Sequence, residues 1–291
     1  MGGAHVDRKD KGGIAHTRSG CDHGGRRPHR GGAAYCANVS ELTNRVAVVT
    51  GASSGIGAEL ARALAQRGWH CVLLARREQR LRPLAEEIGG EFELCDVSDR
   101  AAVDAVAARI LERHPRIHLL VNNAGFTRRG DFLTGDPQGI EDVVRTNYLG
   151  SVWCLQAFLP GLEAAAPCDV VNIVSVAGTV AVPQSGPYAA SKHAQLAFSR
   201  AVAAQLRPRG IRVHTVKPGY VETEGFPQAW LPAPLRRLVI GPDQIVSHVL
   251  SSLEHGRGET TVPHYYRVAS VLQALIPNLF VRVLARSGDR R

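Results

Sequence analysis

The sequence is poor in methionine and aromatic residues, and it contains no long apolar run. Met1 is the only methionine among the 291 residues, and Phe, Trp and Tyr together make up 5% of the chain. No stretch approaches the roughly 18 consecutive apolar residues that predict a membrane-spanning helix. No apolar segment follows the charged N-terminal residues either, so the sequence does not predict a signal peptide. With 44% apolar and 21% charged residues, the chain has the composition of a soluble globular protein.

Cysteine and histidine occur without the spacing of a metal site. The six cysteines include no pair separated by two residues, and the 12 histidines show no paired ligand spacing, so the sequence predicts no bound metal. Cys71, Cys95 and Cys154 lie in apolar runs and are expected in the core. Scattered cysteines of this kind are typical of a reducing compartment. We therefore expect a cytoplasmic protein.

The formal net charge of +9 is unevenly distributed, because residues 1–40 carry seven basic and only three acidic side chains. A basic balance suits nucleic acid, an anionic membrane surface or a phosphorylated ligand. The sequence has no zinc-finger spacing, aromatic RNA-binding motif or recognition-helix signature, so we expect no nucleic-acid partner. Residues 1–40 are also rich in Gly, Arg and His without hydrophobic periodicity. This composition predicts a disordered tail ahead of a domain at 41–262.

From Arg45 onward, short apolar runs alternate with amphipathic helical segments. The expected strands are 45–50, 70–75, 91–95, 117–122, 169–175, 211–217 and, most weakly, 259–262. Helical spacing of Ala and Leu fills intervening segments such as 56–67, 99–113, 141–163 and 188–206. Near-continuous apolar strands separated by helices indicate a parallel sheet covered on both faces. The sequence therefore predicts a doubly wound α/β fold of the Rossmann type, with about seven strands.

A glycine-rich turn joins the first expected strand to the first helix, with the sequence TGASSGIG at 50–57. Glycine at such a turn lets the backbone approach a pyrophosphate, and the helix N-terminus offers unpaired N–H groups. A flexible turn without a ligand is the alternative, but the strand–turn–helix context favours a dinucleotide. The expected cofactor contacts in this turn are Gly51, Ser53, Ser54, Gly55, Ile56 and Gly57.

The residues after the second strand favour NADP(H) over NAD(H). A carboxylate at this position would bind the ribose 2′-hydroxyl of NAD, and residues 74–77 contain none. Arg76 and Arg77 stand there instead, and a guanidinium can contact a 2′-phosphate through charge-assisted hydrogen bonds. We expect Arg76 to make the main contact and Arg77 to support it. The alternative is that both arginines only solvate the end of the strand.

Polar residues also follow the third and fourth strands, at the sheet edge where open α/β sheets bind ligands. Asp96 and Val97 come after the third strand, and Asp96 can accept a hydrogen bond from an adenine amino group. Asn123, Ala124 and Gly125 come after the fourth strand. Helix capping is the alternative role for Asp96, although Ser98 and Asp99 are better placed for it.

Tyr188 and Lys192 are four residues apart, so on a helix their side chains share one face. The ordinary pKa of a tyrosine is about 10, and a nearby ammonium would stabilise the phenolate for proton transfer near neutral pH. Ser175 ends the fifth strand, where its hydroxyl can polarise a carbonyl. Asn147 lies in a helical stretch, where it can hold a water that links Lys192 to solvent. In isolation, a Tyr–Lys pair at this spacing is also what an ordinary helix surface carries.

Together these motifs resemble the short-chain dehydrogenase/reductase family. The motifs TGASSGIG at 50–57, NNAG at 122–125, YAASK at 188–192 and PGYVET at 218–223, with Asn147 and Ser175, occur in the family's order and at its usual spacing. The resemblance covers about residues 44–262 and its joint motifs are highly specific.

The resemblance implies a catalytic tetrad of Asn147, Ser175, Tyr188 and Lys192. Tyr188 would be the acid/base, and Lys192 would lower the pKa of Tyr188 and bind the nicotinamide ribose. Ser175 would orient the substrate, and Asn147 would support the proton relay. Contacts on the nicotinamide side would come from Pro218, Gly219, Val221 and Thr223. A homodimer through the helices at 141–163 and 188–206 is the family expectation.

The chain departs from many family members after the last strand, where it lacks a glycine-rich segment and continues through residues 263–291. Apolar residues recur there at helical spacing, and Pro277 interrupts them, which predicts a kink or two short helices. Three interpretations remain open. The apolar stripe packs against its own domain or a partner subunit, lies on a membrane interface through 264–286, or walls the substrate pocket. The extension resembles that of family members that act on lipophilic ketones and associate with membranes.

Residues 223–241 are the expected substrate cover, because they combine apolar residues with Pro227, Pro232 and Pro234. Its apolar members are Phe226, Trp230, Leu231, Leu235 and Leu238. We therefore expect an NADP(H)-dependent reductase of a lipophilic ketone or aldehyde. Two other classes stay open: an NADP(H)-binding sensor or scaffold without turnover, and a peripheral membrane protein with a vestigial enzyme domain.

Overall fold

The computed structural model describes residues 45–128, 130–181, 185–224 and 236–288. The predicted disordered tail at 1–40 lies outside the described residues. So do Phe226, Trp230, Leu231 and Leu235 of the expected substrate cover, together with its three prolines.

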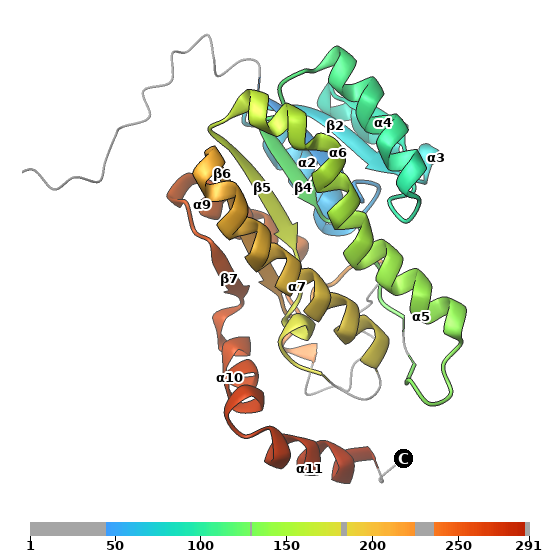
Figure 1. Cartoon of the computed structure of the whole chain (residues 1–291), viewed down its shortest axis with the longest axis vertical. Coiled ribbons are helices and arrows are strands. Elements are labelled where there is room, and N and C mark those ends of the chain that lie inside the picture. The colour runs from blue at the N-terminus through green and yellow to red at the C-terminus, as the bar shows by residue number, and fades with distance from the viewer. Residues whose placement is uncertain (1–44, 129, 182–184, 225–235, 289–291) are drawn as a thin grey trace, which may run out of the picture. The chain divides into compact units, whose positions relative to one another are not determined.

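Seven parallel strands form one sheet in the order β3-β2-β1-β4-β5-β6-β7 (Figure 1). The strands are β1 Val46–Thr50, β2 His70–Ala75, β3 Glu91–Leu94, β4 Leu119–Asn122, β5 Cys168–Ile173, β6 Ile211–Pro218 and β7 Glu259–Val262. Each neighbouring pair is parallel. The strand order reverses between β1 and β4, which is the switch point where such sheets bind ligands. The predicted doubly wound fold is confirmed.

Helices cover both faces of the sheet. They are α2 Gly55–Ala65, α3 Glu78–Ile88, α4 Arg100–Arg113, α5 Pro137–Val144, α6 Gly150–Ala165, α7 Gly186–Leu206 and α9 Pro242–His255. Alternate residues of β1 point to opposite faces, because strand side chains have a period of two. Ala47 and Val49 pack with α2, α3 and α9, whereas Val46 and Val48 pack with α4, α6 and α7. Two apolar layers therefore enclose the sheet and hold its strand ends in fixed positions.

The expected single helix at 141–163 is divided by a π-helical turn. Residues Arg145–Leu149 form this turn, η1, between α5 and α6. A π turn adds one residue to the backbone ring and is often found at functional sites. Asn147 lies inside it and is fully buried.

The four cysteines in the described part of the chain are all buried and unpaired. Burial raises the pKa of the Cys71 and Cys168 thiols to about 12. For Cys95 burial raises the pKa to about 11, and the pKa of Cys154 is raised by the same cause. A thiol with a raised pKa keeps its proton and is a poor nucleophile.

The C-terminal extension begins with a short 3₁₀ turn, η5 His264–Tyr266, and continues as α10 Arg267–Leu275 and α11 Pro277–Gly288. A bend of 106° separates the two helices at Pro277 (Figure 1). Within the described ranges no single helix has both the length and the apolar character to cross a membrane, whereas this bent pair meets those two criteria together.

The apolar stripe of the extension is exposed. Among its members, Val268, Leu275 and Val283 are 61%, 74% and 56% exposed. Polar residues of α10 make the contacts with the domain instead: Ser270 Oγ lies 2.7 Å from Thr179 Oγ1, and Gln273 Oε1 accepts from the Ala181 N–H at 3.0 Å. The described part of the domain therefore leaves these side chains uncovered, and a partner subunit or a membrane surface stays a prediction for the stripe.

Candidate active site

The four expected catalytic residues come from three elements at the carboxyl ends of the strands. Ser175 follows β5, Asn147 lies in η1, and Tyr188 and Lys192 lie on α7. Ser175 lies close enough to Tyr188 to lower the pKa of the phenol, against the effect of burial. A Cβ atom placed on Gly125 would lie 2.9 Å from Asn147 Oδ1 and 3.6 Å from Lys192 Nζ. The structure therefore brings all four side chains to the end of β5 and β4, as the motifs predict.

Asn147 is held by both edges of its amide. Its Oδ1 accepts from the Phe126 N–H at 2.9 Å, and its Nδ2 donates to Phe126 O and to Ser191 Oγ, each at 3.0 Å. Ser191 in turn donates to the backbone carbonyl of Tyr188 at 2.7 Å. This chain of bonds fixes η1 against α7, so Asn147 also positions the backbone of the tyrosine.

Lys192 is buried with its ammonium on neutral acceptors. Its Nζ donates to Ile173 O at 3.1 Å and to Gln195 Oε1 at 2.7 Å, and the residue is 4% exposed. Burial lowers the pKa of Lys192 to about 7, because the charged form loses water. Nζ lies 6.0 Å from the centre of the Tyr188 ring. Burial raises the pKa of Tyr188, and its side-chain interaction with Ser175 acts in the opposite direction.

Two buried residues that the sequence analysis missed extend this network. Gln195 Nε2 donates to Ser151 Oγ at 2.9 Å, and Ser151 Oγ donates to the Asn147 carbonyl at 3.4 Å. A continuous path of side chains therefore links Lys192 to the backbone of Asn147. The spacing offers a signal, since Gln195 is three residues after Lys192 on one helix face and Ser151 is four residues after Asn147.

The glycine-rich turn packs tightly against the end of β4. Gly51 has a φ of +66°, and a Cβ there would lie 2.7 Å from the Ala124 Cα. A Cβ on Gly57 would lie 2.5 Å from Asn123 Nδ2, which donates to the Thr50 carbonyl at 3.0 Å. Only glycine fits at these two positions. Asn123 and Ala124 thus lie beside the turn, where the sequence analysis expects cofactor contacts.

The N-terminus of α2 is available to an anion. Ser54 is the N-cap residue, but its side chain makes no capping hydrogen bond to the helix. The first N–H groups of a helix have no intrahelical partner, and the helix dipole favours negative charge there. Thr223 lies on the other side of the turn, since a Cβ on Gly55 would be 3.2 Å from its Cγ2. The turn and helix therefore fit a pyrophosphate between them.

Arg77, rather than Arg76, lies against the glycine-rich turn. Its Nη2 donates to Ser54 Oγ at 2.7 Å and to Ser53 Oγ at 3.0 Å. Arg76 is 69% exposed at its side chain and contacts Asp96 Oδ2 at 3.3 Å. Glu224 pairs with Arg77 at 3.0 Å and with Arg80 at 2.8 Å. The Arg77 guanidinium therefore contacts both the hydroxyls of the turn and the Glu224 carboxylate.

The remaining expected cofactor residues take mixed roles. Asp96 Oδ1 accepts from the backbone N–H of Ser98 at 2.9 Å, and Asp99 is the N-cap of α4. Val97 is buried, and a Cβ on Gly150 would lie 2.9 Å from its Cγ2, so Val97 packs against α6.

Pro218 ends β6, next to the segment that the resemblance assigns to the nicotinamide side. The Tyr266 ring covers Gly219, because a Cβ there would lie 2.1 Å from a ring carbon. Val221 is buried. The C-terminal extension therefore begins on top of this segment.

Comparison with known proteins gives a consistent assignment. The model of the short chain dehydrogenase family matches residues 45–230. "Dehydrogenase/reductase SDR family member 7B" of Xenopus laevis is 32% identical over 270 residues, which cover 86% of this chain and 84% of that protein. The protein of the same name in Danio rerio is 36% identical over 193 residues, and this match spans only 62% of that relative's length.

Two solved structures with the same fold are complexes with nicotinamide dinucleotides. A short chain dehydrogenase/reductase from Burkholderia phymatum in complex with NAD has a TM-score of 0.73 and 26% identity, covering 82% of this chain and 96% of that chain. Actinorhodin polyketide ketoreductase with NADPH has a TM-score of 0.69 and 29% identity, covering 75% of this chain and 95% of that chain. The matched region contains the glycine-rich turn and the four clustered side chains. This chain therefore belongs to the short-chain dehydrogenase/reductase family of oxidoreductases.

Proposed function

We propose that the protein is an NADP(H)-dependent oxidoreductase that interconverts a lipophilic ketone or aldehyde and its alcohol, with Tyr188 as the acid/base. The observation that best supports this proposal is the convergence of Ser175, Tyr188 and Lys192 at the end of β5, with the ammonium buried beside the phenol. The polyketide ketoreductase with NADPH supports the direction from carbonyl to alcohol.

The cofactor would lie across the switch point of the sheet. The turn at Gly51 and Gly57 and the N-terminus of α2 would hold its pyrophosphate. Arg77 would bind a 2′-phosphate together with Ser53, and Arg76 would close over it. The nicotinamide, when bound, supplies or accepts the hydride. A 2′-phosphate also competes with Glu224 for Arg77, so the carboxylate would give way to it.

Proton handling falls to the side chains of the chain itself. In the direction of reduction, the substrate carbonyl oxygen accepts hydrogen bonds from Ser175 and Tyr188, and Tyr188 gives its phenol proton to that oxygen. The raised pKa of Tyr188 keeps this proton in place at neutral pH. Lys192 would stabilise the phenolate that forms, and Gln195 and Ser151 would hold its ammonium in place. A proton from solvent would restore the phenol after each turnover.

Two surfaces are the proposed binding sites for partners. The exposed apolar side of α10 and α11 would contact a membrane surface through 264–286, with Arg267 and Arg282 toward anionic headgroups. Leu159 and Phe198 help to line an apolar groove between α6 and α7, which would receive the same helices of a second copy. Such a homodimer would lie on the cytoplasmic surface of a membrane. Lipophilic substrates partition into the bilayer, so the enzyme would be close to them.

The experiment that tests the proposal is oxidation of NADPH and NADH at 340 nm by the purified chain, with carbonyl compounds of graded length and bulk. We expect turnover with NADPH that rises with substrate hydrophobicity. Faster turnover with NADH would contradict the roles of Arg76 and Arg77. Tight NADPH binding without turnover on any carbonyl would favour the alternative, an NADP(H)-binding sensor or scaffold.

A further inference from the structure

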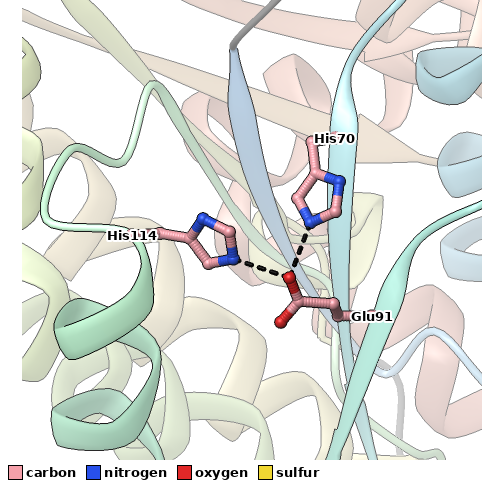
Figure 2. A group of neighbouring side chains, drawn as sticks. All are labelled: His70, Glu91 and His114. Atoms are coloured by element: carbon pink, nitrogen blue, oxygen red, sulfur yellow. Dashed lines mark hydrogen bonds and ion pairs between the residues drawn. The ribbon is translucent and has the colours of Figure 1, made fainter.

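Three potential metal ligands meet at the edge of the sheet. His70 is the first residue of β2, Glu91 is the first residue of β3, and His114 is the C-cap of α4. Figure 2 shows both imidazoles turned toward the same carboxylate. Within the part of the chain that the structure describes, this is the one group of three His, Cys, Asp or Glu residues with ligand atoms close enough to hold an ion.

The geometry is close to that of a zinc site. His70 Nε2 and His114 Nε2 lie 2.9 Å and 2.8 Å from Glu91 Oε1, and all three ligand atoms lie within 4.8 Å of one another. In a tetrahedral site with bonds of about 2.0–2.1 Å, neighbouring ligand atoms are about 3.3 Å apart. Separating each nitrogen from the oxygen by about half an ångström would therefore admit the ion.

The surroundings suit a bound cation as well. The three side chains are 31%, 33% and 19% exposed, which leaves room for a water as a fourth ligand. Arg113 Nε contacts Glu91 Oε2 at 3.1 Å, and its Nη2 contacts Glu93 at 2.9 Å. Arg113 thus orients the carboxylate from its second oxygen and leaves Oε1 toward the histidines. Metal-bound carboxylates typically carry such an outer hydrogen bond.

We propose that His70, Glu91 and His114 form a zinc site that ties the edge strand β3 to β2 and to the end of α4. On binding, each imidazole ligates through an unprotonated Nε2 and carries one proton on Nδ1, and any further proton passes to solvent. The site lies at the amino ends of β2 and β3, whereas the residues of the candidate active site lie at the carboxyl ends. Its role is therefore to stabilise this edge of the fold, and it does not depend on the proposed reaction.

The test is titration of zinc into the full-length, chelator-treated protein by calorimetry, with His70→Gln, His114→Gln and Glu91→Gln as variants. Glutamine places an amide nitrogen near the former Nε2 and retains a hydrogen bond, but it is a poor zinc ligand. We expect each variant to bind at least about 10-fold to 100-fold more weakly than the parent chain. At a zinc concentration about 100 times the dissociation constant, the melting midpoint of the parent chain should rise by roughly 5–10 °C.

His255→Gln is the matched control, because His255 is an exposed histidine of α9. It should bind zinc like the parent chain. The histidines in residues 1–40 are the same in every variant, so their binding cancels when the variants are compared. Equal zinc affinity in all variants would overturn the proposal, as would binding without a rise in the melting midpoint. If a variant does not fold, cobalt added to the parent chain decides the matter: a tetrahedral visible absorption spectrum supports the site, and an octahedral one overturns it.

Discussion

Helix α7 and the C-terminal pair α10–α11 depart from the usual pattern of a surface helix in opposite ways. On α7, Lys192, Gln195 and Ser199 are 4%, 0% and 0% exposed. On the C-terminal pair, Val268 and Leu275 are 61% and 74% exposed. One region buries polar side chains, and the other leaves apolar side chains in contact with solvent.

The difference lies in where each region finds its partners. The buried polar groups of α7 are paired within the chain, since Gln195 bonds Lys192 and Ser151 and Ser199 lies 2.6 Å from Thr215 Oγ1. Burial of a polar group is costly unless it is hydrogen-bonded, so such a network is retained for what it positions. The apolar side chains of the C-terminal pair instead keep much of their surface exposed in the described part of the chain. We infer that the domain itself supplies the hydrogen-bond partners of α7, and that a surface outside the domain covers the apolar side chains of α10 and α11.

The largest expected effect comes from removing one hydroxyl on the α7 side. Tyr188→Phe keeps the ring and its packing but deletes the proton donor. We expect kcat for carbonyl reduction to fall by about 10²–10⁴-fold, with little change in the dissociation constant for NADPH. Stopped-flow and steady-state assays measure both values. Tyr265→Phe, on the exposed start of the extension, is the control and should keep full activity; an equal loss there would contradict the assignment.

The next effect tests whether the buried network positions Lys192. Gln195→Leu removes an acceptor from Nζ and the donor to Ser151, and a hydrogen bond to a charged group is worth about 1.5–3 kcal/mol. We expect kcat to fall by about 10-fold to 100-fold, with a further lowering of the pKa of Lys192 because its charged form loses a partner. A shift of the pH–rate profile distinguishes this role from a general loss of stability. Gln66→Leu, at the exposed C-cap of α2, is the control and should leave the profile unchanged.

The pH dependence offers a smaller and graded test of the same buried groups. Burial raises the pKa of Tyr188, so the protonated acid persists through neutral pH and is lost only as the pH rises through that raised value. Reduction should therefore first weaken near pH 7, where Lys192 loses its proton, and then decline by about tenfold per pH unit above the raised pKa of Tyr188. Alcohol oxidation needs the phenolate, so its rate should be highest at high pH. Initial rates in both directions from pH 6 to about 11 measure this. Parallel profiles in the two directions would exclude Tyr188 as the titrating group.

The smallest effect on catalysis is expected on the C-terminal side. Leu275→Glu places a charge on the exposed apolar stripe, and a surface substitution of this kind changes stability by about 0.5 kcal/mol or less. Activity toward a small water-soluble carbonyl should be unchanged, while flotation with anionic vesicles should be lost. Gln66→Glu adds the same charge at the exposed C-cap of α2 and should float normally. If Leu275→Glu floats as well as the parent chain, the proposed membrane contact through α10 and α11 is wrong.

The sequence predicts the regular parts of this fold well because their signals are local. Strands β1, β2 and β4 are short apolar runs, whereas β3 and β7 alternate or carry polar residues and give weaker signals. The Tyr188–Lys192 pair follows from spacing on one helix. The prediction of a single helix at 141–163 fails at η1, because a π turn depends on packing of Asn147 against Phe126 and Ser191.

Contacts between segments that are distant along the chain could not be predicted from the sequence either. The His70–Glu91–His114 group depends on the register of β2 with β3 and on where α4 ends, so its spacing along the chain resembles no ligand motif. Helical periodicity predicted α10 and α11, but periodicity carries no information about what covers an apolar stripe.

The burial of the cysteines has a practical consequence for labelling. With a pKa raised to about 11, as for Cys95, only about one thiol in 10⁴ is ionised at pH 7. Maleimides and disulfide reagents attack the thiolate, so Cys71, Cys95, Cys154 and Cys168 will react very slowly in the folded protein. Once Cys21 and Cys36 are replaced by serine, a single cysteine introduced on α11 becomes the dominant site of attachment. A fluorophore placed there reports directly, by its emission colour and quenching, whether lipid, a second copy or water lies against the apolar stripe.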